Sequence, residues 1–272
     1  MRQSYLEMHG AGNRIVVIDR RSASTPAAAA DALSALTAGG VKFDQLMWLE
    51  AAEDPAHAGR YRVFNVDGSE VEQCGNGARC LVRAISGRGG RQFVLESPAG
   101  LVEARLLDGD RVAVNMGSPV LEPVAIPFIA DEQARRYTLD VAGEQFDVAV
   151  LSMGNPHCVL DVADVETAAV ERLGPLIERH ERFPARANVG FMQVIDRSHI
   201  ALRVHERGAG ETLACGTGAC AAVVAGRRAG RLDDEVEVRL PGGQLVVSWR
   251  GAVGPVWLTG AAELIREGSI DL

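Results

Sequence analysis

A short cysteine-containing pattern occurs twice in the chain and constrains its fold more than any other feature. CGNGA begins at Cys74 and CGTGA begins at Cys215. Each copy follows a strand-like run and a glycine-containing loop, and each opens a helical pattern that a glycine ends. The expected strands are 61–64 and 200–204, and the expected helices are 78–85 and 219–228. Because the context repeats along with the motif, the sequence predicts an internal duplication.

The remaining pattern predicts more strands than helices. Alternating runs at 111–115 and 236–240 indicate half-buried strands, and further helices are expected at 27–36 and 165–172. We therefore predict the α+β class, with two pseudo-symmetric similar domains that each wrap strands around a central helix, and a cleft between the domains. The expected domains are 1–117 and 118–260, because prolines cluster just after residue 117 (Pro119, Pro123 and Pro127).

Composition excludes several classes of function. The net charge is −8, and basic residues cluster only in pairs, so a nucleic-acid partner is not expected. No apolar run is long enough for a membrane helix, and the first residues lack the apolar core of a signal peptide. Five cysteines, an odd number, favour free thiols and a cytoplasmic location. Lys42 is the only lysine and has no phosphate-binding pattern around it, which argues against pyridoxal phosphate.

A cysteine at the start of a helix has a chemical use. The unpaired N–H groups and the positive end of the helix dipole favour the thiolate, by about 0.3–2 kcal/mol, and should lower the pKa of Cys74 and Cys215. The exposed N–H groups of the adjoining glycines can also hold a carboxylate. Two such thiols, one deprotonated and one protonated, suit a racemase or epimerase, which needs a base on one face of a carbon and an acid on the other.

Two other interpretations of the cysteines are weaker. Cysteine is often a core residue, and we expect core packing for Cys80, Cys158 and Cys220. A zinc site is not expected, because Cys74 and Cys80, like Cys215 and Cys220, are too widely spaced for a zinc knuckle.

The two motifs, extended to 73–80 and 206–220, resemble the signatures of bacterial diaminopimelate epimerase. Further blocks that look like that family follow in order along nearly the whole chain: 8–13, 43–45, 64–69, 115–117, 152–158 and 240–243. The resemblance implies conversion of LL-diaminopimelate to the meso form, for lysine and peptidoglycan synthesis, with no cofactor and no metal. It also implies a homodimer, and a final segment, 261–272, that returns to the first domain.

The resemblance assigns roles to individual residues. Cys74 matches the proton donor and Cys215 the acceptor, while His157 and Glu206 match positions thought to adjust the acidity of the thiols. The residues that match substrate contacts are Asn13, Gln45, Asn65, Gly75, Asn76, Asn155, Asn188, Glu206, Arg207, Gly216 and Thr217. A bidentate arginine beside a glutamate suits a substrate with a distal amino-acid head.

The sequence departs from the family pattern at two places. Arg14-Ile15 stands where the family usually has Asp-Phe, and Arg266 stands where many members have a tyrosine used in dimer packing. Two rival interpretations remain open: a proline or hydroxyproline racemase of the same superfamily, and a silent small-molecule binding protein. The Glu206-Arg207 pair favours diaminopimelate over proline, and the retention of both cysteine motifs argues against a silent site.

Overall fold

The computed structural model describes residues 1–272 except 1, 24, 26, 72–73, 89–90 and 252–253. The chain divides into two compact units. Unit 1 contains Met1–Asn115 and Thr259–Leu272, and unit 2 contains Met116–Leu258. In the described part of the chain, no helix is both long and apolar enough to span a bilayer.

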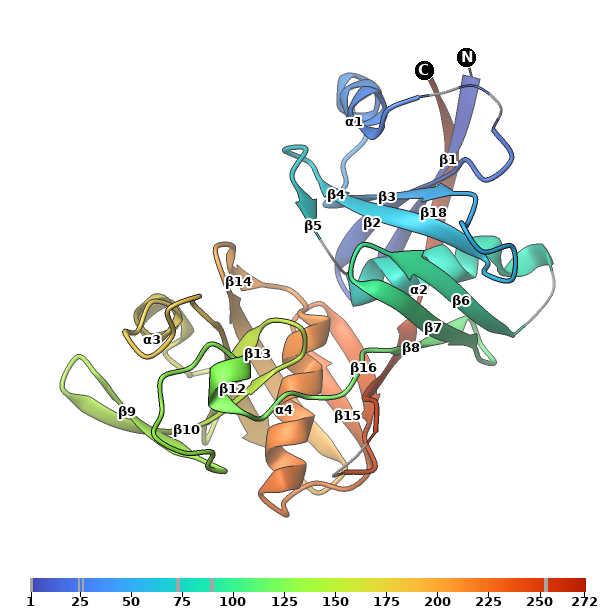
Figure 1. The fold of residues 1–272 in the computed structure, drawn as a ribbon. Helices are drawn as coiled ribbons and strands as arrows, with labels where there is room; N and C mark the ends of the chain where they lie inside the picture. Colours follow the sequence, from blue (N-terminus) through green and yellow to red (C-terminus); the bar gives the residue numbers. More distant parts are fainter. Residues whose placement is uncertain (1, 24, 26, 72–73, 89–90, 252–253) are drawn as a thin grey trace. The chain divides into compact units, whose positions relative to one another are not determined.

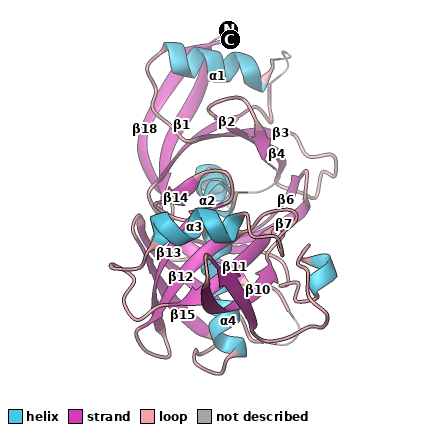
Figure 2. Cartoon of the chain, turned by 90° about the vertical axis from the view of Figure 1, so that its left-hand side faces the viewer, coloured by secondary structure: helices cyan, strands magenta, loops and turns pink. Residues whose placement is uncertain are grey.

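Unit 1 is a sheet built around one helix (Figures 1 and 2). The pairing runs β18-β1-β2-β3-β4, then from β4 to both β5 and β6, and on through β7 to β8. Its strands are β1 (Arg2–Gly10), β2 (Asn13–Asp19), β3 (Gln45–Glu50), β4 (Gly59–Asn65), β5 (Glu70–Val71), β6 (Gln92–Ser97), β7 (Gly100–Leu106), β8 (Arg111–Asn115) and β18 (Glu263–Asp271).

Helix α2 (Gly75–Ile85) is the central helix of unit 1. It contacts β1, β2, β3, β7 and β8 and buries residues on all its sides, including Leu81, Val82 and Ile85. A second helix, α1 (Ala29–Ala38), packs its apolar residues against side chains of β1, β2 and β3, among them Tyr5, Val16 and Trp48. A short 3₁₀ turn, Ser86–Arg88, continues from α2. The start of α2 is therefore held by strands around it.

Unit 2 repeats the same order of elements. Its pairing runs β9-β10-β11-β12-β13, then from β13 to both β14 and β15, and on to β16. The bounds are β9 (Tyr137–Val141), β10 (Glu144–Ser152), β11 (Pro156–Asp161), α3 (Val170–Glu178), β12 (Asn188–Val194), β13 (His199–Glu206), β14 (Gly210–Thr212), α4 (Gly216–Arg228), β15 (Glu235–Leu240) and β16 (Gly243–Ser248), with β17 (Trp257–Ala261) at the boundary and a 3₁₀ turn at Pro123–Ala125.

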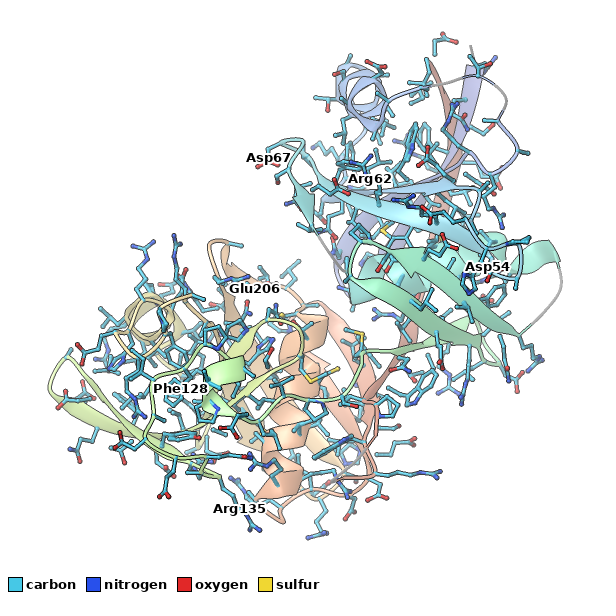
Figure 3. The ribbon with its side chains drawn as sticks, in the orientation of Figure 1. Asp54, Arg62, Asp67, Phe128, Arg135 and Glu206 are labelled. Carbon is cyan, nitrogen blue, oxygen red and sulfur yellow. The ribbon has the colours of Figure 1, made fainter. Side chains whose placement is uncertain are left out.

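The duplication extends to individual pairings and side chains. The parallel pairs β2–β3 and β4–β6 of unit 1 correspond to β11–β12 and β13–β15 of unit 2. Arg62, labelled in Figure 3, forks onto Glu70 through two bonds of 2.7 Å, and Arg203 forks onto Glu211 at 2.6 and 2.8 Å. Helix α4 contacts β10, β11, β12, β13 and β16 as α2 contacts its own strands. The predicted α+β class with two similar domains around central helices is confirmed.

Some predicted helix bounds were wrong. Helices α2 and α4 begin at Gly75 and Gly216, three residues before the expected starts at 78 and 219. Helix α3 begins at Val170 rather than at residue 165. Residues 164–167 instead form a turn, in which the Asp164 side chain accepts bonds from the Glu166 N–H and the Thr167 hydroxyl. A short aspartate satisfies these donors locally and so delays the helix.

Candidate active site

Both motif cysteines are N-cap residues of the central helices. Cys74 has extended backbone angles and precedes α2, and its Sγ accepts the Gly77 N–H at 3.2 Å. Cys215 has nearly the same angles and precedes α4. The second glycine of each motif lies against a strand: a Cβ at Gly77 would lie 2.4 Å from Met47 Sδ, and one at Gly218 would lie 3.0 Å from a Val204 methyl carbon. The glycines therefore let each helix start approach its sheet closely.

The thiol of Cys215 differs from the expectation of a lowered pKa. Burial raises its pKa well above the usual value, and the nearby Glu206 carboxylate raises it further. Weaker hydrogen bonds to Thr217 and to the Gly218 backbone act in the opposite direction. Thr217 Oγ1 lies 3.5 Å from Sγ. The helix dipole is worth less than burial beside an anion, so the protonated thiol form of Cys215 is favoured near pH 7.

Glu206 lies at the end of β13 and is labelled in Figure 3. Its Oε1 accepts a hydrogen bond of 2.5 Å from the Thr212 hydroxyl, and the carboxylate also bonds to the Cys215 thiol. The structure thus brings together four predicted residues of unit 2: Glu206, Cys215, Gly216 and Thr217.

In unit 1, the predicted contacts Asn13, Gln45 and Asn65 lie at strand ends. Asn13 begins β2, immediately after Gly12, which has a φ of 87°. Gln45 faces Asn65 across β3 and β4, and its Nε2 donates to Asn65 Oδ1 at 3.1 Å. Gln45 Oε1 is buried and has no hydrogen-bond partner among the described residues. That oxygen therefore keeps unused acceptor capacity in the structure.

Asn76, the predicted contact at the start of α2, is buried beside a residue that the sequence analysis missed. Its Oδ1 accepts 2.9 Å from Nη2 of Arg79, whose side chain is fully buried one turn along the helix. The available signal in the sequence was an arginine directly after the CGNGA motif. Arg79 fixes the side chain of Asn76 and adds positive charge within α2.

In unit 2, Asn155 and His157 are joined directly. His157 Nε2 lies 2.9 Å from Asn155 Oδ1, and the imidazole is almost fully buried. Burial lowers its pKa to about 3, with a smaller contribution from the Arg207 charge. His157 is therefore a neutral imidazole near pH 7, and it supplies no positive charge to a thiolate.

Asn188 and Arg207 are also joined. Asn188 Nδ2 donates to the Pro156 carbonyl at 3.0 Å, and its Oδ1 accepts the Arg207 N–H at 3.0 Å. The Arg207 guanidinium donates to the Ala185 carbonyl at 3.1 Å and is exposed. Asn188 therefore ties the strand that carries His157 to the turn that carries Arg207.

The other three cysteines, Cys80, Cys158 and Cys220, are free thiols buried in the core, as expected. Burial raises the pKa of Cys80 to about 12. Among the described residues, no group of three or more His, Cys, Asp or Glu side chains is placed to hold a metal ion.

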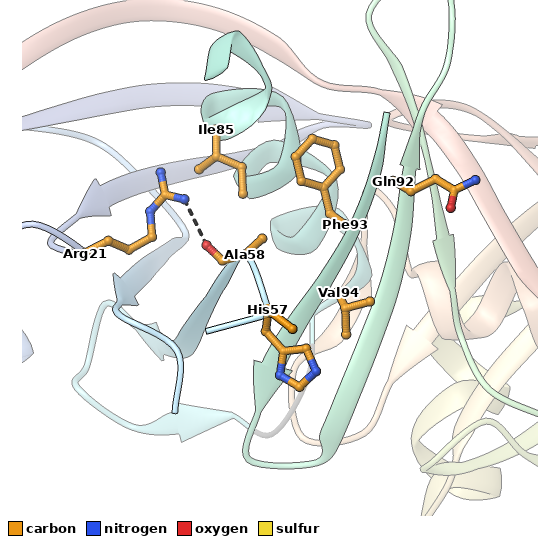
Figure 4. A pocket seen from close by; sticks show the side chains of 8 residues that line it. Arg21, His57, Ala58, Ile85, Gln92, Phe93 and Val94 are labelled. Carbon is orange, nitrogen blue, oxygen red and sulfur yellow. Dashed lines mark hydrogen bonds between the residues drawn. The ribbon is translucent and has the colours of Figure 1, made fainter. Parts of the chain in front are cut away.

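A surface pocket of about 260 Å³ in unit 1 involves none of the predicted site residues (Figure 4). In it, Arg21 donates to the Ala58 carbonyl at 2.9 Å, and His57 contacts Glu96 at 2.9 Å. The other residues that line it are Ala56, Ile85, Gln92, Phe93 and Val94.

Comparison with known proteins decides the family. The family model described as diaminopimelate epimerase matches residues 5–122 and 149–265. The diaminopimelate epimerases of Alkalilimnicola ehrlichii and Thioalkalivibrio sulfidiphilus are 51% and 50% identical to this chain, and each match covers 100% of both chains. The chain belongs to the diaminopimelate epimerase family.

Solved structures with low sequence identity share the fold of this family member. A phenazine biosynthesis protein of the PhzF family from Bacillus anthracis is 15% identical, with a TM-score of 0.70 and 100% of both chains covered. A hydroxyproline epimerase from Agrobacterium vitis is 18% identical, with a TM-score of 0.66, and the match covers 99% of this chain and 92% of that one. These matches show the two-unit fold alone.

The two departures from the diaminopimelate epimerase pattern meet at one carboxylate. Arg14 on β2 and Arg266 on β18 both donate to Glu7, which lies on β1 between them and is fully buried. Burial would raise the pKa of Glu7, but the bonds from Arg266 and Arg14 outweigh it and hold the pKa low. The reversed charge at residue 14 thus has a structural partner within unit 1.

Proposed function

We propose that this protein inverts one α-carbon of diaminopimelate, converting the LL form to the meso form, and that Cys74 and Cys215 exchange the proton. One observation carries the mechanism: each of two similar units places a cysteine at the N-cap of its central helix. Membership of the family and curated relatives at about half identity support the substrate.

In the LL-to-meso direction, Cys215 acts as the base and Cys74 as the acid. The Cys215 thiolate removes the α-proton, the electron pair of the broken C–H bond moves toward the substrate carboxylate, and the Cys74 thiol delivers a proton to the opposite face. The enzyme then holds a thiol at Cys215 and a thiolate at Cys74, so the two titrate as a coupled pair. The N–H groups at the starts of α2 and α4 stabilise the charge on the carboxylate.

The resting Cys215 thiol must first lose its proton. The negative charge of Glu206 lies beside Cys215 and therefore favours the neutral thiol over the thiolate. A substrate ammonium that pairs with Glu206 offsets that charge and so favours the thiolate once substrate is bound. We propose that Glu206 thereby delays activation of the base until the substrate is in place.

His157 acts through hydrogen bonds rather than charge in this proposal. Its low pKa keeps it neutral at working pH, and its bond to Asn155 fixes the Asn155 amide. Gln45 and Asn65 suit a zwitterionic head, because a side-chain amide both donates and accepts, and Gln45 Oε1 has no partner among the described residues. Arg207 suits the distal carboxylate.

The test uses reduced, metal-free protein with pure LL-diaminopimelate in D₂O, without pyridoxal phosphate. We expect meso product that carries solvent deuterium at the inverted carbon. Cys74→Ala and Cys215→Ala should each abolish inversion, and Cys220→Ala, which removes a buried thiol of α4, is the matched control and should retain it.

Two outcomes would contradict the proposal. No product and no deuterium from folded protein would reject diaminopimelate as the substrate. Inversion of proline at a comparable rate would favour a racemase with a single-headed substrate.

We also propose that the protein works in the cytoplasm, which its free cysteines suit. We propose in addition that the protein forms a homodimer. The tyrosine that many family members use in dimer packing is replaced here by Arg266, which bonds to Glu7 of its own chain. Sedimentation of wild type beside Arg266→Tyr tests that proposal: a dimer in both supports it, and a wild-type monomer contradicts it.

A further inference from the structure

The turn that carries Glu206 and Arg207 is held by a glutamate from another element. Glu178, the last residue of α3, has a side chain that is only 3% exposed. Its Oε1 accepts the Gly208 N–H at 3.0 Å, and its Oε2 lies 3.1 Å from His205 Nε2. His205 directly precedes Glu206, and Gly208 directly follows Arg207. The Glu178 carboxylate therefore contacts the residues on both sides of the Glu206-Arg207 pair.

Helix α3 has a notch that fits His205. A Cβ at Gly174 would lie 2.6–2.8 Å from Cγ, Cβ and Nδ1 of His205, so only a glycine leaves room for the ring. Gly174 and Glu178 are four residues apart and therefore share one face of the helix. The imidazole thus packs on the helix backbone and reaches the carboxylate from there.

The turn closes the β13–β14 hairpin, in which Glu206 pairs with Gly210, but few bonds within residues 207–209 restrict its backbone. Gly208 and Gly210 both have positive φ, 78° and 81°, and the Ala209 N–H returns to the Glu206 carbonyl at 3.1 Å. Two glycines leave this backbone many alternative conformations. Anchors from outside the turn, namely Asn188 at the Arg207 N–H and Glu178 at the Gly208 N–H, help to select one of them.

The corresponding turn of unit 1 is held differently. There Asp67, labelled in Figure 3, accepts 2.9 Å from the Ser69 N–H and 2.6 Å from its hydroxyl, and Asn65 Nδ2 donates to Ser69 Oγ at 3.0 Å. Unit 2 has Gly208 and Gly210 at the positions of Asp67 and Ser69, if the turns are matched through Asn65 and Glu206. Glu178 thus supplies from another element the kind of support that Asp67 and Ser69 supply within the turn of unit 1.

The Glu178 carboxylate is ionised near pH 7. Burial would raise its pKa, but bonds from His205 and the Gly208 N–H outweigh burial and hold it below the usual value. Among the described residues, the Arg179 charge also acts on this carboxylate, and Arg186 Nη1 lies 3.6 Å from Oε1. A charged acceptor makes a stronger bond to a backbone N–H than a neutral one.

We propose that Glu178 is a positioning residue for the epimerisation: through His205 and Gly208 it holds Glu206 beside Cys215 and presents Arg207 to the distal head of the substrate. This inference rests on the proposed function. It assigns Glu178 no contact with substrate, and its effect passes through the turn.

The experiment compares wild type with Glu178→Ala, Glu178→Gln and Glu171→Ala. Glu171 is an exposed glutamate of the same helix and is the matched control. We expect Glu178→Ala to raise KM for LL-diaminopimelate about 10-fold, which is the size expected when one hydrogen bond to a charged group is lost. The decrease in kcat should be smaller than this factor. Glu178→Gln keeps the volume and an acceptor for Gly208, so it should remain folded and recover part of the loss, while Glu171→Ala should match wild type.

A second readout does not depend on the substrate. In a Cys74→Ala background, alkylation of Cys215 is followed against pH by peptide mass spectrometry. If Glu178→Ala lets Glu206 move away from Cys215, the pH midpoint of Cys215 alkylation should fall by about one unit. A variant that is only less stable would keep the wild-type midpoint. Folded Glu178→Ala with wild-type KM and an unchanged midpoint would overturn the inference.

The two readouts separate this inference from the proposed function. An inactive wild type would reject the proposed function, and the alkylation midpoint would still test whether Glu178 holds Glu206 beside Cys215.

Discussion

Asn188 holds the Arg207 backbone through its side chain, because its Oδ1 accepts the Arg207 N–H at 3.0 Å. Its Nδ2 is also used, as a donor to the Pro156 carbonyl. A residue predicted from family resemblance as a substrate contact therefore has a second task within the protein. Its substitution should affect stability as well as binding.

We expect Asn188→Ala to lower the free energy of unfolding and to raise KM. The Pro156 carbonyl would lose its partner in a buried place, at a cost of about 1–3 kcal/mol, and the Arg207 N–H would lose its partner in a partly buried one, at a smaller cost. Urea unfolding and steady-state kinetics measure the two effects. Gln244→Ala, which removes an exposed amide on β16, should change stability by less than about 0.5 kcal/mol. Unchanged stability in Asn188→Ala would contradict the assigned bonds.

Glu206→Gln should let Cys215 titrate at lower pH. The raised pKa of Cys215 comes first from burial and then from the Glu206 charge, so removing that charge leaves only part of the increase. The thiolate of Cys215 should therefore form at lower pH than with glutamate present. Ultraviolet thiolate absorbance in a Cys74→Ala background, with Cys74→Ala/Cys215→Ala as the blank, provides the measurement. Identical titration curves with and without the Glu206→Gln substitution would exclude the electrostatic contribution.

Gly268→Ala should destabilise unit 1. Tyr5 on β1 faces Gly268 on β18, and a Cβ there would lie 2.3–2.7 Å from the ring and hydroxyl of Tyr5. The tyrosine would have to leave its buried position, at a cost of about 1–3 kcal/mol. The urea midpoint should fall, while Ser269→Ala on the same strand should change it little. An unchanged midpoint would show that the ring moves without cost.

Glu96→Gln should reduce the loss of stability in acid. Hydrogen bonds from the Asp54 and Glu53 N–H groups, followed by His57, lower the Glu96 pKa to about 2. The folded pKa lies below the unfolded value of about 4.3. The stability that ionised Glu96 contributes to the folded protein is therefore present above the unfolded pKa and is lost as the pH falls toward 2. Urea midpoints against pH should decline less steeply in the variant over this interval, and exposed Glu103→Gln should retain the wild-type slope.

Local patterns predicted the fold well where one face of an element is apolar. The run 111–115 coincides with β8, and 236–240 lies within β15. The starts of α2 and α4 were misplaced because their first turns contain two glycines, which have low helix propensity. The cap formed by Cys74 Sγ and the close packing of Gly77 on Met47 outweigh that propensity.

The candidate site was predictable only where it lies in a motif. Cys74, Cys215 and their glycines form a repeated pattern, and the substrate contacts came from family resemblance. Glu178 could not be found in this way, because it is separated by 27 residues from His205 and looks like an ordinary helix-end glutamate. Its role depends on tertiary contacts with Gly208, which a single sequence does not display. Likewise, the raised pKa of Cys215 depends on burial rather than on its place at a helix start.

The pairing of β1 with β18 determines the order in which the units become complete on the ribosome. Arg2 is opposite Asp271, and the whole of unit 2 separates these two strands in the chain. Unit 2 is continuous and has all its residues once Leu258 has been synthesised. Unit 1 begins first but must wait for its last strand, with the edge of β1 unpaired and prone to pair wrongly in the meantime. The domain that is translated first is therefore expected to finish folding second.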